Sequence, residues 1–279
     1  MSAASGIAMA RRIAVVTEAI LRLYPRHTHA ATVLAPFRTV ADIATAVPKI
    51  VQSGLAPLIL EYIDMMTMTA ITAARGLDLG IGQEIKEAAL AYLVVVLESR
   101  DQGRLDEDIE RLGDLIAALG ALDVYVLPAG AATSLIEARE RAFFAAKAAG
   151  ANEIVDTVVP RAQIPEFLAQ VSTIAQATGS MILGCGHAGD GNVHMSVFQP
   201  DAERLEEALR AMFAASAALG GAVSGEHGIG TDKRSHYLAL EDPAKLALMG
   251  RIKAAFDPDG ILNPGVIFDS APAVAVSVQ

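Results

Sequence analysis

Two stretches of this chain repeat one order of elements, a strand, a helix and a second strand joined by short connections. This repeat constrains the fold more than any other feature, because two such units on one sheet form a ferredoxin-like layer. We therefore expect an α+β fold in which repeated βαβ units form an antiparallel sheet flanked by helices. The predicted elements of the repeat are residues 32–37, 40–52 and 57–63, followed by 91–97, 105–119 and 123–127.

The remaining chain keeps alternating between helices and strands and then ends in a helical segment. One predicted helix ends at Gly150, and another begins at Pro243 and stops before Asp257. Apolar spacing and breaker residues predict the other elements. They are helices at 65–75, 131–149, 165–178 and 203–219, and strands at 153–159, 181–187 and 193–198.

The composition limits the class of protein. Hydrophobic residues make up 53% of the 279 residues, which is enough to form a sizeable core. The net charge of −10 argues against a nucleic-acid partner. Cys185 is the single cysteine, so no internal disulfide can form and a reducing compartment is favoured. Apolar runs are too short to span a membrane. We therefore expect a cytoplasmic protein, and a peripheral membrane association is compatible with this expectation.

The segment 186–194, Gly-His-Ala-Gly-Asp-Gly-Asn-Val-His, carries the clearest chemical signal. Asp190-Gly191 is typical of a two-residue hairpin turn, which would place His187 directly opposite His194. Directly opposed residues have Cβ atoms about 4.5–5.5 Å apart, so two imidazoles there could hold one ion. The alternative is that each histidine is an ordinary, hydrogen-bonded group of a sheet.

The segment 224–230, Ser-Gly-Glu-His-Gly-Ile-Gly, places Glu226 beside His227 in a glycine-rich turn. Glycines there permit close backbone approach and unusual dihedral angles. With the two histidines, Glu226 would complete an open metal site of two imidazoles and one carboxylate. The alternative is a solvated loop, because sequence alone does not bring the two segments together.

These motifs resemble the signatures of the FAD-linked oxidase C-terminal domain family. This family includes the glycolate oxidase FAD subunit, D-lactate dehydrogenases and D-2-hydroxyglutarate dehydrogenase. The segment 256–265, Phe-Asp-Pro-Asp-Gly-Ile-Leu-Asn-Pro-Gly, resembles its closing motif, and 60–64, Leu-Glu-Tyr-Ile-Asp, also fits. The resemblance runs from about residue 13 to residue 268, and 15–19 resembles the last strand of the preceding flavin domain.

The resemblance implies a role for six residues. His227 would be the general base, and Arg139 would bind the substrate carboxylate, with an ordinary helix-surface charge as its alternative. Asn263 would lie near the flavin, with a simple Asn-Pro turn as its alternative. The implied cofactors are FAD and a divalent metal ion, with Zn²⁺ as the first candidate. The implied metal ligands are His187, His194 and Glu226.

The resemblance also implies a division of the chain and sets limits on the substrate. Most of the flavin-binding half of the relatives is not contained in this chain. Ile154 and Phe143 stand where some 2-hydroxyglutarate enzymes have polar contacts, which disfavours a long dicarboxylate. The implied segments are 1–30 as the end of a flavin-binding domain, 31–225 as a substrate or cap domain, 226–270 as a C-terminal segment packing toward the flavin, and 271–279 as a loose tail.

We therefore expect the substrate- and metal-binding part of an enzyme that oxidises a small D-2-hydroxy acid, of the glycolate or D-lactate type, to the 2-oxo acid. The isolated chain is expected to be inactive. The alternative is a non-catalytic binding or assembly subunit that retains the fold without flavin. Besides the substrate, the expected partner is a flavin-domain polypeptide or a second copy of the chain.

Overall fold

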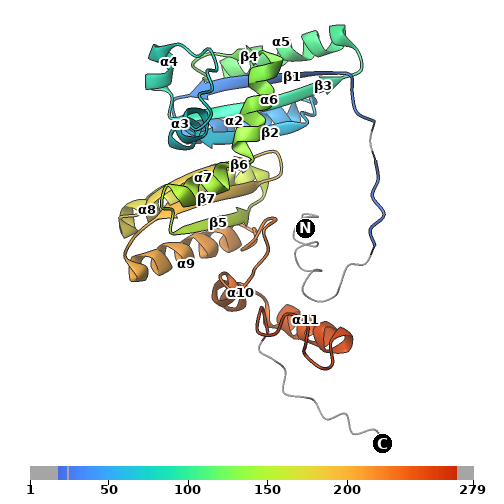
Figure 1. Ribbon diagram of the computed structural model, residues 1–279, viewed down its shortest axis with the longest axis vertical. Coiled ribbons are helices and arrows are strands. Elements are labelled where there is room, and N and C mark those ends of the chain that lie inside the picture. Colours follow the sequence, from blue (N-terminus) through green and yellow to red (C-terminus); the bar gives the residue numbers. More distant parts are fainter. Residues whose placement is uncertain (1–17, 24, 269–279) are drawn as a thin grey trace, which may run out of the picture.

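The structure is a computed structural model that describes residues 18–23 and 25–268 (Figure 1). The expected tail at 271–279 and the first part of the expected 1–30 segment lie outside the described residues. Among the described residues, no helix is both long enough and apolar enough to cross a membrane.

A seven-stranded sheet forms the centre of the described chain, with the strand order β4-β1-β3-β2-β6-β7-β5. Every neighbouring pair of strands in it is antiparallel. The strand Ala91–Ser99 is apolar and buried on both faces along residues 91–97, because helices cover the sheet on both sides. The strands are β1 (His29–Phe37), β2 (Ile59–Asp64), β3 (Ala91–Ser99), β4 (Tyr125–Leu127), β5 (Glu153–Val158), β6 (Met181–His187) and β7 (Asn192–Phe198).

The sheet consists of two ferredoxin-like units placed edge to edge. The order β4-β1-β3-β2, with helices α2 (Val40–Gln52) and α5 (Gln102–Ala118), confirms the predicted repeat. The second unit arranges β6, β7 and β5 in the corresponding way, and an isolated bridge between Val158 and Ala222 takes the position of its fourth strand. The units join where β2 pairs with β6, so this junction brings together residues far apart in the sequence.

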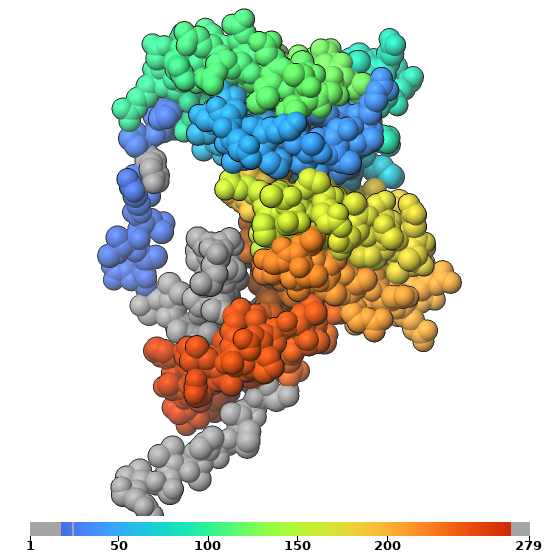
Figure 2. Space-filling view, turned by 180° about the vertical axis from the view of Figure 1, so that it is seen from behind, coloured from blue at the N-terminus to red at the C-terminus, as the bar shows by residue number. Residues whose placement is uncertain are grey.

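Four helices form a continuous layer on one face of the sheet. Figure 2 shows α5, α2, α8 (Ile164–Thr178) and α9 (Ala202–Ala218) in succession from one end to the other. Their buried side chains, such as Ile50, Leu112, Phe167 and Met212, belong to one core with the strands. The apolar spacing of these helices predicts this packing against the sheet. The candidate site residues lie on the opposite face.

The opposite face carries shorter helices. They are α3 (Met65–Ala73), α4 (Gln83–Ala88), α6 (Ala129–Arg139) and α7 (Ala142–Ala148). The prediction of one continuous helix over 131–149 is therefore wrong, because the backbone leaves helical geometry at Arg141. Leu135 and Ala138 of α6 pack on the first unit, whereas α7 lies over strands of the second unit. One straight helix could not cover both surfaces.

The C-terminal part is helical, as predicted. Helix α11 (Pro243–Phe256) begins with Pro243 in its first turn, and the Asp242 side chain accepts a hydrogen bond from the amide of Ala244. Helix α10 (Arg234–Leu240) and the short 3-10 turn at Arg161–Gln163 were not predicted. Tyr237 of α10 donates a hydrogen bond to the sulfur of Met249 in α11, which ties the two helices together.

Candidate metal and substrate site

The hairpin of β6 and β7 brings His187 and His194 together, but not in the predicted register. Cys185 pairs with His194 and His187 pairs with Asn192, so the connection has four residues, 188–191, instead of two. The direct opposition of His187 and His194 is therefore wrong. Because residues 185 and 187 point to the same face, the two imidazoles are still diagonal neighbours, with ring centroids 5.3 Å apart.

The connection is wider than predicted because its backbone bonds to other strands. The amide of Gly189 donates to the carbonyl of Leu60 at 3.0 Å, and the carbonyl of Gly191 accepts from the amide of Val159 at 3.0 Å. These bonds remove both glycines from the ladder between β6 and β7. The sequence pattern of a hairpin turn gives no information about these hydrogen bonds to other parts of the chain.

Glu226 reaches the two histidines from the loop after α9. Its Oε1 lies 3.5 Å from Nε2 of His187 and 3.3 Å from Nε2 of His194. One candidate ligand atom from each of the three residues lies within 4.8 Å of the others. The hydrogen bond with His194 lowers the pKa of Glu226 below its ordinary value, so this carboxylate is ionised near neutral pH. Two imidazoles and a carboxylate fit a divalent cation such as Zn²⁺.

Glu61, on β2, orients His187 within this cluster. The Glu61 side chain is 7% exposed, and its Oε1 lies 2.8 Å from Nδ1 of His187. This hydrogen bond raises the pKa of His187, and it outweighs the opposing effect of burial. When Nδ1 donates to Glu61, Nε2 carries the lone pair that faces Glu226. Such carboxylate–histidine pairs typically orient metal-binding imidazoles.

Arg139, the last residue of α6, shares Glu61 with His187. Its Nε lies 2.6 Å from Oε2 of Glu61, and its Nη2 lies 2.7 and 2.8 Å from the two ring nitrogens of His187. The guanidinium is mostly buried, so the alternative of an ordinary helix-surface charge does not describe it. A cation on Nε2 of His187 would compete with the guanidinium for that lone pair.

A second buried carboxylate, Asp156 on β5, holds the loop that carries Glu226. It accepts hydrogen bonds from the hydroxyl of Ser224 and from the amides of three consecutive residues, 225–227. Burial opposes its charge, but Lys233 nearby and the His227 amide outweigh burial and lower the pKa of Asp156. Asp156, His194 and His227 also lie close enough to hold a metal. The bonds that Asp156 already accepts favour Glu226 as the carboxylate ligand instead.

His227 lies beside the proposed ligands, and its side chain is more exposed than those of His187 and His194. Its ring stacks on that of His194 with centroids 5.1 Å apart, and Phe143 meets it edge-on at 6.2 Å. Burial lowers the pKa of His227, so the ring is neutral near pH 7 and able to accept a proton. Its Nε2 faces the cluster, 3.9 Å from Oε1 of Glu226.

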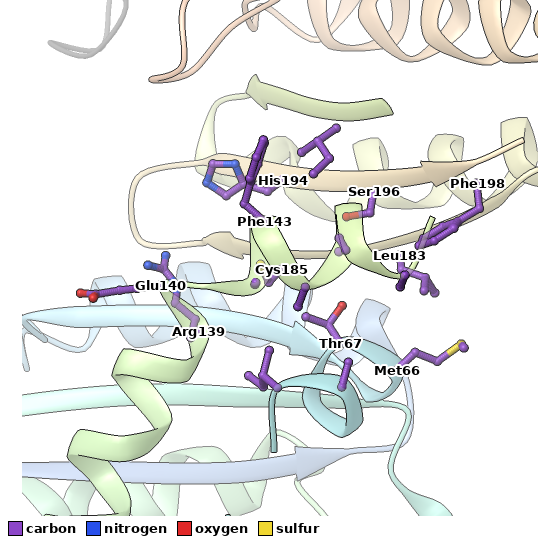
Figure 3. Close-up of a pocket in the computed structure, with 18 of the residues that line it drawn as sticks. Met66, Thr67, Arg139, Glu140, Phe143, Leu183, Cys185, His194, Ser196 and Phe198 are labelled. Atoms are coloured by element: carbon purple, nitrogen blue, oxygen red, sulfur yellow. The ribbon is translucent and has the colours of Figure 1, made fainter. Parts of the chain in front are cut away.

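A cavity of about 400 Å³ opens next to this cluster, between α3, α7 and the strands of the second unit. Figure 3 shows His194 and Arg139 at one end and Leu183, Phe198 and Met66 at the other. The exposed Met66 lines this cavity. Met68, on the same helix, is buried in the core.

Asn263 lies apart from the cluster, whereas Cys185 lines the cavity. Asn263 occupies an exposed turn with a φ of +47°, and it lines neither of the cavities found near the cluster. Its proposed place near the flavin stays a prediction. Cys185 is buried, and burial raises the pKa of its thiol to about 12. It is therefore a small core residue and not a reactive thiol.

Sequence reasoning missed Glu61 and Asp156 as site residues. Each is an acidic residue inside an apolar strand, in Ile-Leu-Glu-Tyr-Ile-Asp and Glu-Ile-Val-Asp-Thr-Val respectively. A charged residue at such a position is rarely buried unless it is paired. This pattern could have marked both carboxylates, although it would not have identified their partners.

The fold and the cluster define an α+β domain whose ionisable groups gather at the junction of two ferredoxin-like units. Residues 26–267 match the family model described as FAD linked oxidases, C-terminal domain, and the chain belongs to that family. The resemblance inferred from the motifs is thereby confirmed.

Relatives named as oxidoreductases match most of the chain. An uncharacterized FAD-linked oxidoreductase of Mycobacterium tuberculosis is 53% identical over 92% of this chain and 56% of its own length. A D-lactate dehydrogenase of Archaeoglobus fulgidus is 30% identical over 91% of this chain and 55% of its own length. A glycolate oxidase subunit of Bacillus subtilis is 30% identical over 92% and 54% respectively. The chain thus spans about half the length of the curated relatives it matches.

Solved structures support the fold. The 4-ethylphenol oxidase from Gulosibacter chungangensis aligns with a TM-score of 0.63 at 17% identity, over 88% of this chain and 55% of that chain. p-Cresol methylhydroxylase aligns with a TM-score of 0.59 at 15% identity, over 88% and 54% respectively. At these identities the likeness concerns the fold alone.

Proposed function

We propose that this chain is the substrate- and metal-binding part of an FAD-linked enzyme that oxidises a D-2-hydroxy acid, the class to which D-lactate belongs, to the 2-oxo acid. The observation that carries the proposal is the convergence of His187, His194 and Glu226 beside a guanidinium and a neutral imidazole. The names of the D-lactate dehydrogenase and glycolate oxidase relatives support the substrate class.

Each residue of the site has a distinct role in this proposal. Arg139 binds the carboxylate of the acid, because a guanidinium can donate two parallel hydrogen bonds to it. Nε2 of His227 accepts the proton of the 2-hydroxyl group. His187, His194 and Glu226 would hold a Zn²⁺-like cation, while Glu61 keeps His187 in the correct tautomer. When bound, the cation would supply Lewis acidity and FAD would supply the redox chemistry.

The role of the metal can be tested by calorimetry. Zn²⁺ is titrated into the chelator-treated chain, and D-lactate is then titrated into the chain with and without Zn²⁺. We expect one Zn²⁺ per chain and D-lactate binding that requires the metal. His187→Ala and His194→Ala should each weaken Zn²⁺ binding by at least about tenfold, because each removes one of three protein ligands.

A matched control is His29→Ala, which removes an imidazole at the start of β1 and should leave Zn²⁺ binding unchanged. Equal Zn²⁺ content in the wild type and both ligand variants would reject the metal site. Equal D-lactate binding with and without Zn²⁺ would reject the role of the metal in substrate binding.

A further inference from the structure

The cavity beside the cluster is divided into a polar end and an apolar end (Figure 3). The groups assigned to the hydroxyl and carboxylate of a 2-hydroxy acid, His187, His194, Glu226, His227 and Arg139, all belong to the polar end. A substrate held there would direct the remainder of its side chain away from the cluster, along α7 and strands β6 and β7. The lining of the apolar end therefore defines which side chain the acid carries.

The far end of the cavity is lined by large apolar side chains from separate elements. Met66 comes from α3, Leu183 and Phe198 come from the two strands of the hairpin, and Ile154 comes from β5. Met66 is 46% exposed and Phe143, on α7, is 43% exposed. Large apolar side chains that remain exposed around a concavity are typical of a ligand site.

The charges around the cavity point to a ligand with one carboxylate. Among the described residues that line it, Arg139 is the only one with a permanent positive charge, and Glu140 and Glu226 are acidic. The small polar groups of Thr67 and Ser196 are the polar side chains farther along. A second carboxylate in the apolar end would lose its hydration without gaining a cationic partner.

We propose that the substrate is a D-2-hydroxy acid with a bulky aliphatic or aromatic side chain, selected by the apolar end of this cavity. This inference rests on the proposed function and narrows its substrate class. A cavity of about 400 Å³ is far larger than the space that the single methyl group of D-lactate needs. Each methylene group buried there strengthens binding by roughly fourfold, since its transfer from water contributes about 0.8 kcal/mol.

Calorimetry on the Zn²⁺-loaded chain tests the proposal with four acids. They are glycolate, D-lactate, D-2-hydroxyisocaproate and D-2-hydroxyglutarate. We expect D-2-hydroxyisocaproate to bind at least about tenfold more tightly than D-lactate, since it buries several more carbon atoms. D-2-Hydroxyglutarate is expected to bind more weakly than D-lactate. Glycolate or D-lactate binding as tightly as D-2-hydroxyisocaproate would overturn the inference while leaving the proposed function intact.

Helix α7 offers a matched pair of variants. Ala146 lines the cavity and Ala148, two residues later, is exposed and does not line it. Ala146→Phe should remove the preference for D-2-hydroxyisocaproate over D-lactate, because the added ring fills the apolar end. Ala148→Phe should leave that preference unchanged. An unchanged preference in Ala146→Phe would overturn the inference. If the Zn²⁺-loaded wild-type chain bound none of the four acids, both the inference and the proposed function would be overturned.

Discussion

Glu61 contacts both the proposed substrate-binding residue and one of the proposed metal ligands. One carboxylate oxygen contacts Arg139 and the other contacts His187, so the same buried residue orients the proposed substrate anchor and a proposed metal ligand. Burying a carboxylate is costly unless it is paired and hydrogen-bonded. The guanidinium of Arg139 and the imidazole of His187 offset this cost. Because both bind the same carboxylate, the position of each side chain depends on the other.

The position of Arg139 leads to a prediction about lysine as a substitute. Arg139→Lys should weaken D-lactate binding to the Zn²⁺-loaded chain almost as much as Arg139→Ala, by about tenfold or more. A lysine could pair with Glu61, but it could not also form a two-pronged contact with a carboxylate. Calorimetric affinities of both variants measure this. Arg251→Lys, an exposed change on α11, serves as the control, and unchanged affinity in both Arg139 variants would refute the assignment.

Among the elements, the two loops that carry the candidate ligands are held in different ways. The hairpin connection at 188–191 is fixed by backbone hydrogen bonds to β2 and to the end of β5. The loop at 224–228 is fixed by the carboxylate of Asp156, which is fully buried. Both loops therefore depend on strands that are distant in the sequence.

The hairpin connection should not tolerate a side chain at Gly191. This residue has a φ of +83°, and a Cβ atom there would clash with the carbonyl oxygen of Val159. Gly191→Ala should lower the free energy of unfolding by about 1–3 kcal/mol. Gly250→Ala is the control, because a Cβ at that helical position meets no atom within 4 Å. Urea unfolding should show Gly250→Ala to be at least as stable as the wild type, and equal stability of both variants would contradict this account.

The lowered pKa of Asp156 leads to a prediction about how the free energy of unfolding depends on pH. Its pKa is lowered in the folded chain, so its contribution is present above the ordinary aspartate pKa of about 3.9 and is lost as the pH falls through the lower folded value. Asp156→Asn should cost about 3 kcal/mol at pH 7, because it removes a buried charge from beside Lys233. The difference in the free energy of unfolding between Asp156→Asn and the wild type should become smaller at acidic pH.

Urea unfolding of the chelator-treated chain at pH 7 and near pH 3 measures this dependence. Asp114→Asn, an exposed change on α5, is the control and should have little effect at either pH. A cost for Asp156→Asn that stays the same at both pH values would show that the charge of Asp156 does not stabilise the loop.

At the scale of the whole molecule, the chain gathers its ionisable groups where two ferredoxin-like units meet. His187 and His194 come from the second unit, Glu61 comes from the first, and Arg139 ends a helix packed on the first. A shift at the β2–β6 pairing would therefore separate Glu61 from His187. The junction is the feature of the fold on which the candidate site depends most.

The length of the chain leads to a prediction about turnover. It spans about half of its curated relatives, and a Zn²⁺ ion cannot accept hydride. The purified 279-residue polypeptide should therefore show no dye-linked oxidation of D-lactate or D-2-hydroxyisocaproate, even with excess FAD. Activity should require a separate flavin-domain polypeptide of a relative. Robust turnover by the chain alone, with one FAD bound per chain, would show that it contains a complete flavin site.

The sequence by itself determined the elements and the identity of the main candidates. Apolar spacing, glycine stops and turn residues are local, so the βαβ repeat, α8, α9 and α11 could be predicted from neighbouring residues. The two histidine- and glutamate-bearing motifs could be found in the same way. The family followed from these motifs, because their residue order is specific.

Only the tertiary structure decided how these elements act together. The register of β6 and β7 depends on hydrogen bonds to Leu60 on β2 and to Val159, the residue directly after β5. The break between α6 and α7 depends on the two surfaces that they cover. Glu61 and Asp156 became site residues because a buried carboxylate needs hydrogen-bonding partners. Ser224 lies 68 residues from Asp156 in the sequence, and His187 lies 126 residues from Glu61. Long-range packing, and not local pattern, determines such pairings.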